Sequence, residues 1–162
     1  MKNRAIAVAA LFLALLSALF GCARHTDWLE VFRPAFEAEI DGSWHDQPFS
    51  ALVAAEKAPA EGAREVTVTF YAPKELAGTV LKQAGDGTVT LTAGELTLQT
   101  DAFDDIFTLF PAAAEVSEVT LTDEGHTALL GEGFSLTLLS DGTPYRATRG
   151  ALSVTVVRFE SK

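Results

Sequence analysis

Apolar residues alternate with threonine or serine along much of this chain, and this period of two most constrains what the chain can fold into. Val66, Val68 and Phe70 alternate with Thr67 and Thr69. The same habit recurs at 89–92, 96–98, 119–122, 134–137 and 154–156. Because successive side chains of a strand point to opposite faces, the pattern predicts strands with one buried and one hydrated face. Threonine suits the hydrated face, since its branched Cβ fits the pleat and its hydroxyl meets water.

Earlier strands and the turns between strands complete the pattern. Phe36, Ala38 and Ile40 alternate with acidic residues, which predicts a first strand. A second strand is expected at 49–56, and Asp-Gly-Ser at 41–43 is expected to turn the chain between the two. Glycine-containing turns follow at 85–87, 94, 123–125, 131–133 and 141–142. Short turns of this kind are typical of hairpins, so successive strands should pair antiparallel. We expect one meander of about ten or eleven strands.

One segment, 101–110, has a helical period instead. Its apolar residues at i, i+3, i+4 and i+7 are Phe103, Ile106, Phe107 and Phe110. Thr100 or Asp101 can cap a helix there, and Pro111 can end it. A helix with this aromatic face must bury it, and the apolar face of the meander is available. The predicted fold class is therefore mainly β: a single antiparallel meander forming a half-open barrel around one amphipathic helix.

The first residues resemble a bacterial lipoprotein signal. Lys2 and Arg4 precede an apolar stretch at 5–20, which is shorter than the roughly 20 residues that span a bilayer. Leu19-Phe20-Gly21-Cys22 follows the lipobox pattern, although Phe20 is bulkier than usual, and Cys22 is the chain's one cysteine. The resemblance implies a lipid attached at Cys22 and a location at the cell membrane or outer membrane, on the extracytoplasmic face. An ordinary secretory signal that ends in cysteine is the alternative.

These features divide the chain into a signal peptide at 1–21, a lipidated tether at 22–33 and a half-barrel domain at 34–162. The tether becomes amphipathic around Trp28 and Phe32, which predicts a short helix. After the signal, ten basic residues face 22 acidic ones, a formal net charge of −12. Such a surface disfavours nucleic acid and adsorption to anionic lipids, so membrane attachment depends on acyl chains at Cys22.

Three features together are similar to the outer-membrane lipoprotein carrier (Lol-type) half-barrel superfamily. They are the short strands across 36–159, the apolar helix at 101–110, and the late turn at 141–145 before the last strand. The resemblance implies a hydrophobic cavity that holds acyl chains of a lipid or lipoprotein. In this chain its lining is expected to be Val66, Val68, Phe70, Phe103, Phe107 and Phe134. A filled core is the alternative, because a packed core and a cavity look alike in sequence.

The same resemblance concerns Leu76, in the connection 72–78. The lipid-anchored receptor of that superfamily has an exposed apolar residue in the corresponding connection, which implies membrane contact by Leu76. The alternative is an inward anchor of a tight turn. The soluble carrier of the superfamily has no lipid anchor, so Cys22 argues against a shuttling role.

The sequence offers no catalytic set. His25, His45 and His126 lack metal-ligand spacing, and no second cysteine is present. Ser135 lies within a strand pattern, without a nucleophile elbow. The carboxylates of 37–41 and of 104–105 have the spacing of a solvated strand face and of a helix surface. We expect no metal, no cofactor and no enzymatic activity.

Two hypotheses of function remain open. The first is a lipid-anchored extracytoplasmic protein that binds an apolar ligand, such as a lipid or acyl chain, in the half-barrel cavity. The second is a structural or regulatory envelope lipoprotein that acts as a scaffold for another extracytoplasmic protein, using its acidic, threonine-rich outer face.

Overall fold

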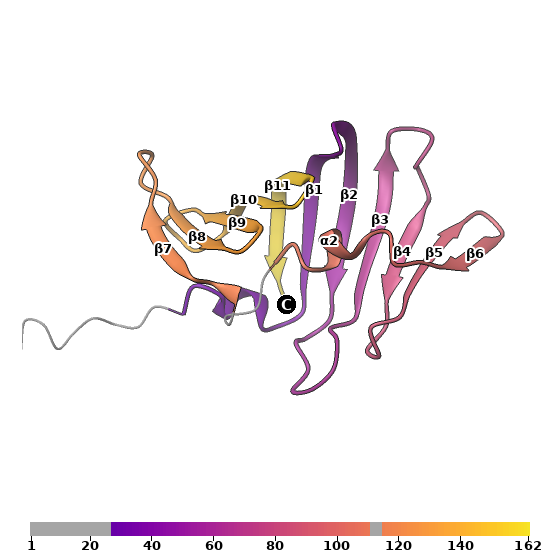
Figure 1. Cartoon of the computed structure of the whole chain (residues 1–162), viewed down its shortest axis with the longest axis horizontal. Coiled ribbons are helices and arrows are strands. Elements are labelled where there is room, and N and C mark those ends of the chain that lie inside the picture. Colours follow the sequence, from indigo (N-terminus) through magenta and orange to yellow (C-terminus); the bar gives the residue numbers. More distant parts are fainter. Residues whose placement is uncertain (1–26, 111–114) are drawn as a thin grey trace, which may run out of the picture.

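Eleven strands form one antiparallel sheet in this computed structural model, which describes residues 27–110 and 115–162 (Figure 1). The strands are β1 (Phe36–Trp44), β2 (Gln47–Ala55), β3 (Val66–Ala72), β4 (Val80–Gln83), β5 (Val89–Ala93), β6 (Leu96–Gln99), β7 (Glu118–Leu121), β8 (Thr127–Gly131), β9 (Phe134–Leu138), β10 (Pro144–Arg149) and β11 (Leu152–Ser161). The helical elements among the described residues are a 3-10 turn, η1 (Glu30–Phe32), and α2 (Asp104–Phe107). The predicted fold class, a mainly β half-open barrel, is confirmed.

The strand order is β6-β5-β4-β3-β2-β1-β11-β10-β9-β8-β7. The central strand β1 pairs with both β2 and β11, so the meander β1 to β6 and the meander β7 to β11 join there. Within the described residues, β6 and β7 are the two edges of the sheet. The chain between them returns across the sheet, and Figure 1 shows α2 in front of the central strands.

The helix is shorter than predicted. It covers Asp104–Phe107 rather than 101–110, and Phe103 occupies its N-cap position. Thr100 does not cap it, because its Oγ1 accepts a hydrogen bond from the amide of Ala102 at 3.0 Å. The segment is too short to cross the sheet as a helix. Five strand spacings separate β6 from β1, about 24 Å, whereas a helix over 100–110 would span about 16 Å. Most of the segment is therefore non-helical. Pro111 lies outside the described residues.

The predicted turn at 41–43 is also wrong. The strand β1 continues to Trp44, and the chain turns at His45 and Asp46, which have φ of 47° and 64°. Two central residues with positive φ give the two-residue turn whose twist matches a hairpin. Gly42 has another role. A Cβ on it would lie 2.6 Å from the carbonyl oxygen of Ser153 and 2.7 Å from Cγ1 of Val154, so glycine lets these strands pack closely.

Four phenylalanines close the end of the barrel where β1 begins. We call this set, Phe32, Phe36, Phe110 and Phe159, the aromatic plug; neighbouring ring centroids lie 5.0–5.7 Å apart. Phe32 belongs to η1, which is all of the predicted tether helix that the described residues contain. Edge-to-face and stacked ring pairs at these distances add specific attraction to apolar burial. The plug thus fixes the start of the domain against the sheet.

Within the described ranges, no helix is long and apolar enough to cross a membrane.

Candidate functional site

A cavity of about 750 Å³ lies between the sheet and α2, at the end opposite the aromatic plug. Its lining residues are Trp44, His45, Gln47, Pro48, Phe49, Phe70, Pro73, Glu75, Leu76, Thr79, Leu91, Phe103, Asp105, Ile106 and Leu152. They come from the end of β1, the β1–β2 turn, β2, β3, the β3–β4 connection, β5, α2 with the residue before it, and β11. The volume lies within the range of pockets that hold small molecules.

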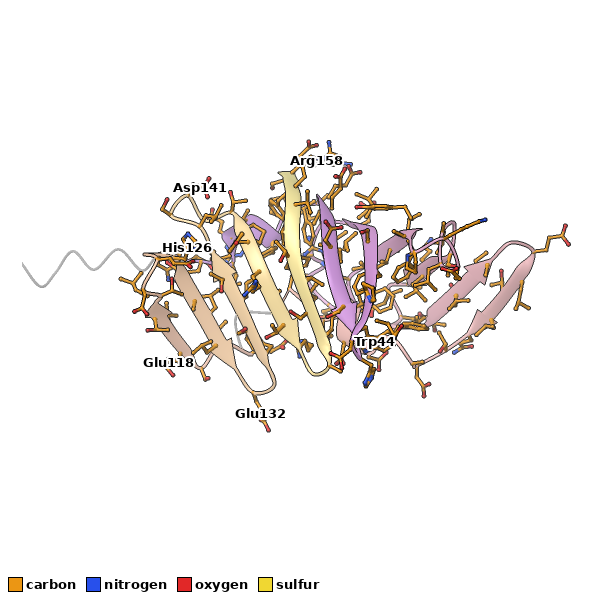
Figure 2. All side chains as sticks on the ribbon, turned by 90° about the horizontal axis from the view of Figure 1, so that it is seen from above. Trp44, Glu118, His126, Glu132, Asp141 and Arg158 are labelled. Atoms are coloured by element: carbon orange, nitrogen blue, oxygen red, sulfur yellow. The ribbon has the colours of Figure 1, made fainter. Side chains whose placement is uncertain are left out.

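The wall is mostly apolar because the inward positions of several strands contribute to it. The Phe49 ring lies 5.6 Å from the Phe70 ring, and the Phe103 ring lies 4.8 Å from Trp44. Register places these groups near the open end, since Trp44 pairs with Leu152 at the last position of β1. In Figure 2, Trp44 lies at one end of the central strands and Arg158 lies toward the other. The cavity therefore has its mouth at the Trp44 end.

Arg64 secures the closed end. Its Nη1 donates to the carbonyl oxygen of Phe32 at 2.5 Å, and other guanidinium nitrogens donate to the carbonyls of Pro34 and Glu56. The guanidinium carbon lies 4.7 Å from the centroid of the Phe36 ring, in cation–π contact. Burial lowers the pKa of Arg64, and the Glu56 carboxylate partly opposes this shift. One side chain thus ties η1, the loop after β2 and the plug together.

The polar groups of the cavity lining are at the mouth and on α2. They are His45, Gln47, Glu75, Thr79 and Asp105. Among the described residues that line the cavity, none is lysine or arginine. This lining therefore offers an apolar interior with two carboxylates and no fixed positive charge.

The predicted lining residues are divided between this cavity and the core. Phe70 and Phe103 line the cavity. Val66 and Val68 are buried further along β3; through β2, Val66 is level with Phe36 of the plug, whereas Phe70 is level with Ile40. Position along the strand thus decides which inward residues meet the cavity.

Phe107 and Phe134 pack elsewhere. Phe107 is half-buried against the hydrophobic core. Phe134 covers Gly131 of the neighbouring strand, and the Arg149 guanidinium lies 5.1 Å from its ring centroid. Leu76 is 39% exposed and lies at the mouth of the cavity. Cys22 and His25 lie outside the described residues.

Sequence reasoning missed seven apolar lining residues: Trp44, Pro48, Phe49, Pro73, Leu91, Ile106 and Leu152. The signal for Trp44 was present, because the alternation that starts at Phe36 reaches it through Gly42. Reading Gly42 as part of a turn interrupted that series.

The carboxylates of 37–41 and the hydroxyl of Ser135 have structural partners. Nζ of Lys162 lies 2.5 Å from Glu37, Nη2 of Arg158 lies 2.7 Å from Glu39, and Ser50 donates to Asp41 at 2.6 Å. The Oγ of Ser135 shares a 2.8 Å hydrogen bond with the hydroxyl of Thr148. Groups of three or more possible metal ligands are not found within 27–110 and 115–162.

Comparison with family models and with curated proteins finds no match for this chain. Among solved structures, it is similar to an uncharacterized conserved protein from Thermus thermophilus, with 17% identity, 84% of each chain covered and a TM-score of 0.54. It is similar to a LolA superfamily protein from Nitrosomonas europaea, with 10% identity, 80% of this chain and 87% of that chain covered, and a TM-score of 0.44. It is also similar to MucB in the Pseudomonas aeruginosa MucA/MucB complex, with 15% identity, 83% of this chain and 56% of that chain covered, and a TM-score of 0.48. The Thermus likeness shows a shared fold alone, and the other two are weaker.

Proposed function

We propose that this chain is an extracytoplasmic protein, lipid-anchored through Cys22, that binds an apolar ligand such as a lipid or acyl chain in the half-barrel cavity. The observation that carries the proposal is the cavity itself: about 750 Å³, lined mainly by apolar side chains and open at the Trp44 end. A binding role rather than catalysis also agrees with the described lining residues, in which two carboxylates and one histidine accompany no serine or cysteine nucleophile.

Binding is tested by native mass spectrometry of the full chain carrying Cys22→Ser, purified from cells without detergent, followed by organic extraction of bound material. The serine variant cannot be acylated at this position, so no covalent acyl chain at residue 22 contributes to the mass of bound lipid. Discrete adducts with the mass of a phospholipid or fatty acid support the proposal. An apo mass that persists after incubation with lipid contradicts it.

A cavity-filling variant makes the test specific to the site. Leu91 lines the cavity. Leu98 is the register partner of Leu91 on the neighbouring strand β6, and it is outside the lining. We expect Leu91→Trp to lower lipid affinity about tenfold or more, because the indole occupies ligand space. The matched control Leu98→Trp adds the same side chain without filling the cavity and should bind normally. Equal binding by both folded variants would place the ligand elsewhere.

The anchor is tested separately. The mass of the chain with Cys22 intact should show acyl groups on the peptide that contains residue 22, and the Cys22→Ser variant should lack them. A Cys22 peptide that carries no acyl group would argue against lipidation.

The exposed sheet edges favour a second function, a scaffold for another extracytoplasmic protein. Edge strand β7 exposes Val119 and Leu121, the latter by 73%, and edge strand β6 exposes Leu96 by 60%. Unpaired strand edges with apolar side chains can accept a strand from a partner. Crosslinking in the native envelope should then recover a partner with the unaltered chain but not with Leu121→Lys. Recovery of the same partner with both would remove this edge from consideration.

A further inference from the structure

We propose that the cavity mouth selects amphiphiles with a positively charged head group, a protonated amine or quaternary ammonium, over those with a free carboxylate. The inference rests on the proposed function and specifies its ligand class. Two independent features carry it: the carboxylates of Glu75 and Asp105 and the aromatic pair of Trp44 and Phe103, all of which line the same cavity.

The carboxylates come from different elements. Glu75 lies in the connection after β3, and Asp105 lies in α2. Asp105 lies against the turn between β10 and β11, since a Cβ on Gly150 would be 2.8 Å from its Oδ2. The cavity is therefore flanked by negative charge from two separate segments.

Neither carboxylate has a countercharge among the described residues. No ion pair or side-chain hydrogen bond involves Glu75 or Asp105 within these parts of the chain, whereas Glu37 and Glu39 on the outer face both pair with cations. A cationic head group can supply the missing countercharge. A carboxylate head group would meet like charge and find no lysine or arginine in the described lining.

Aromatic faces at the mouth favour the same ligand class. The Trp44 ring lies 4.8 Å from Phe103 and 5.8 Å from His45, so the mouth has several adjacent π surfaces. Tryptophan is the best cation–π partner among side chains, and aromatic walls are a common means of binding quaternary ammonium groups. Methyl groups of such a head group would also bury against Pro48 and Pro73 in the lining. Charge and aromatic contact thus act on one head group.

The test compares three amphiphiles with the same twelve-carbon chain: dodecyltrimethylammonium, dodecanoate and dodecyl maltoside. Each is titrated below its critical micelle concentration into the full chain carrying Cys22→Ser, with heat as the readout. The titrations are made at about pH 8, above the ordinary titration range of imidazole. We expect the ammonium compound to bind about tenfold more tightly than dodecanoate, with the maltoside between them.

Variants assign the selectivity to the mouth. Asp105→Asn and Glu75→Gln should each lower the ammonium-to-carboxylate affinity ratio about threefold, with little change for the maltoside. Asp104→Asn is the matched control, because it removes the same charge from the same helical turn at an exposed position outside the lining. It reports the effect of the general negative charge of the protein and should leave the ratio within error of the unaltered chain.

The outcomes separate the two proposals. Equal binding of all three amphiphiles, or the same ratio in Asp105→Asn, Glu75→Gln and Asp104→Asn, overturns the head-group selectivity and leaves apolar ligand binding intact. Binding of none of the three overturns the proposed function and the selectivity with it.

Discussion

At the scale of single residues, Arg64 holds together the segments that meet at the closed end of the barrel. Its guanidinium donates to the carbonyls of Phe32 and Pro34, at the end of η1 and just after it, and to the carbonyl of Glu56 in the loop after β2. The side chain amide of Gln83 in turn donates to the carbonyl of Arg64 at 2.8 Å. Planar, forked donors suit several carbonyls at once, which a lysine ammonium cannot reproduce in the same geometry.

Substitution of Arg64 should therefore destabilise the protein whether or not the charge is kept. We expect Arg64→Met to lower the free energy of unfolding by about 2–4 kcal/mol and Arg64→Lys to recover less than half of that loss. Urea denaturation followed by circular dichroism measures both. Arg146→Met, at an exposed arginine, is the control and should change stability by less than about 0.5 kcal/mol. A lysine variant as stable as the unaltered chain would mean that charge alone matters.

At the scale of elements, the close pairing of β1 with β11 depends on Gly42. We expect Gly42→Ala to cost about 1–3 kcal/mol, because its methyl group would meet the Ser153 carbonyl and the Val154 side chain. Ser43→Ala, one residue along the same strand, should have a small effect. Thermal unfolding of both variants decides the matter, and equal losses would show that the cost is not steric.

The strands were largely predictable because alternation is a local property. Val66 to Phe70 and Phe134 to Leu138 follow the expected inward and outward pattern residue by residue. The end of β1 was not predictable, since a glycine needed for close packing and a glycine needed for a turn look the same in sequence. The extent of α2 depends on the width of the sheet that the segment crosses, which no local pattern contains.

The candidate site was predictable only in part for a related reason. Alternation gives the face of each residue, and it placed Phe70 and Val66 on the same inner face. Which of them meets the cavity depends on register with β2 and β1, a non-local property. The lining contributed by Leu152 depends on the pairing of the last strand with the first, which spans most of the chain.

At the scale of the whole molecule, the two tryptophans mark opposite ends. Trp28 lies beside η1 at the closed end, and Trp44 lies at the mouth. β1 separates the ends by nine residues, about 27 Å. Only four residues, 23–26, lie between Cys22 and the first described residue, Asp27, a reach of at most about 18 Å. An acyl anchor at Cys22 would therefore hold the closed end near the bilayer.

Fluorescence quenching tests this orientation. In vesicles that contain brominated lipids, the acylated Trp44→Phe variant, which keeps Trp28, should be quenched more strongly than the Trp28→Phe variant, which keeps Trp44. The physical reason is the steep dependence of quenching on distance from the bromine atoms. Vesicles without bromine supply the reference intensity for each variant. Stronger quenching of Trp44 would instead place the mouth, and Leu76 with it, against the membrane.

The aromatic plug has a kinetic consequence. A cavity closed at the plug end exchanges its contents on the Trp44 side, so an apolar tail that enters first leaves last, and its head group stays at the surface throughout. An incoming molecule cannot push an occupant out from behind. Turnover of the bound molecule is therefore dissociative: the residence time is a property of the occupied protein, and a rise in the concentration of competitor changes which molecule binds next but not how soon the present one departs.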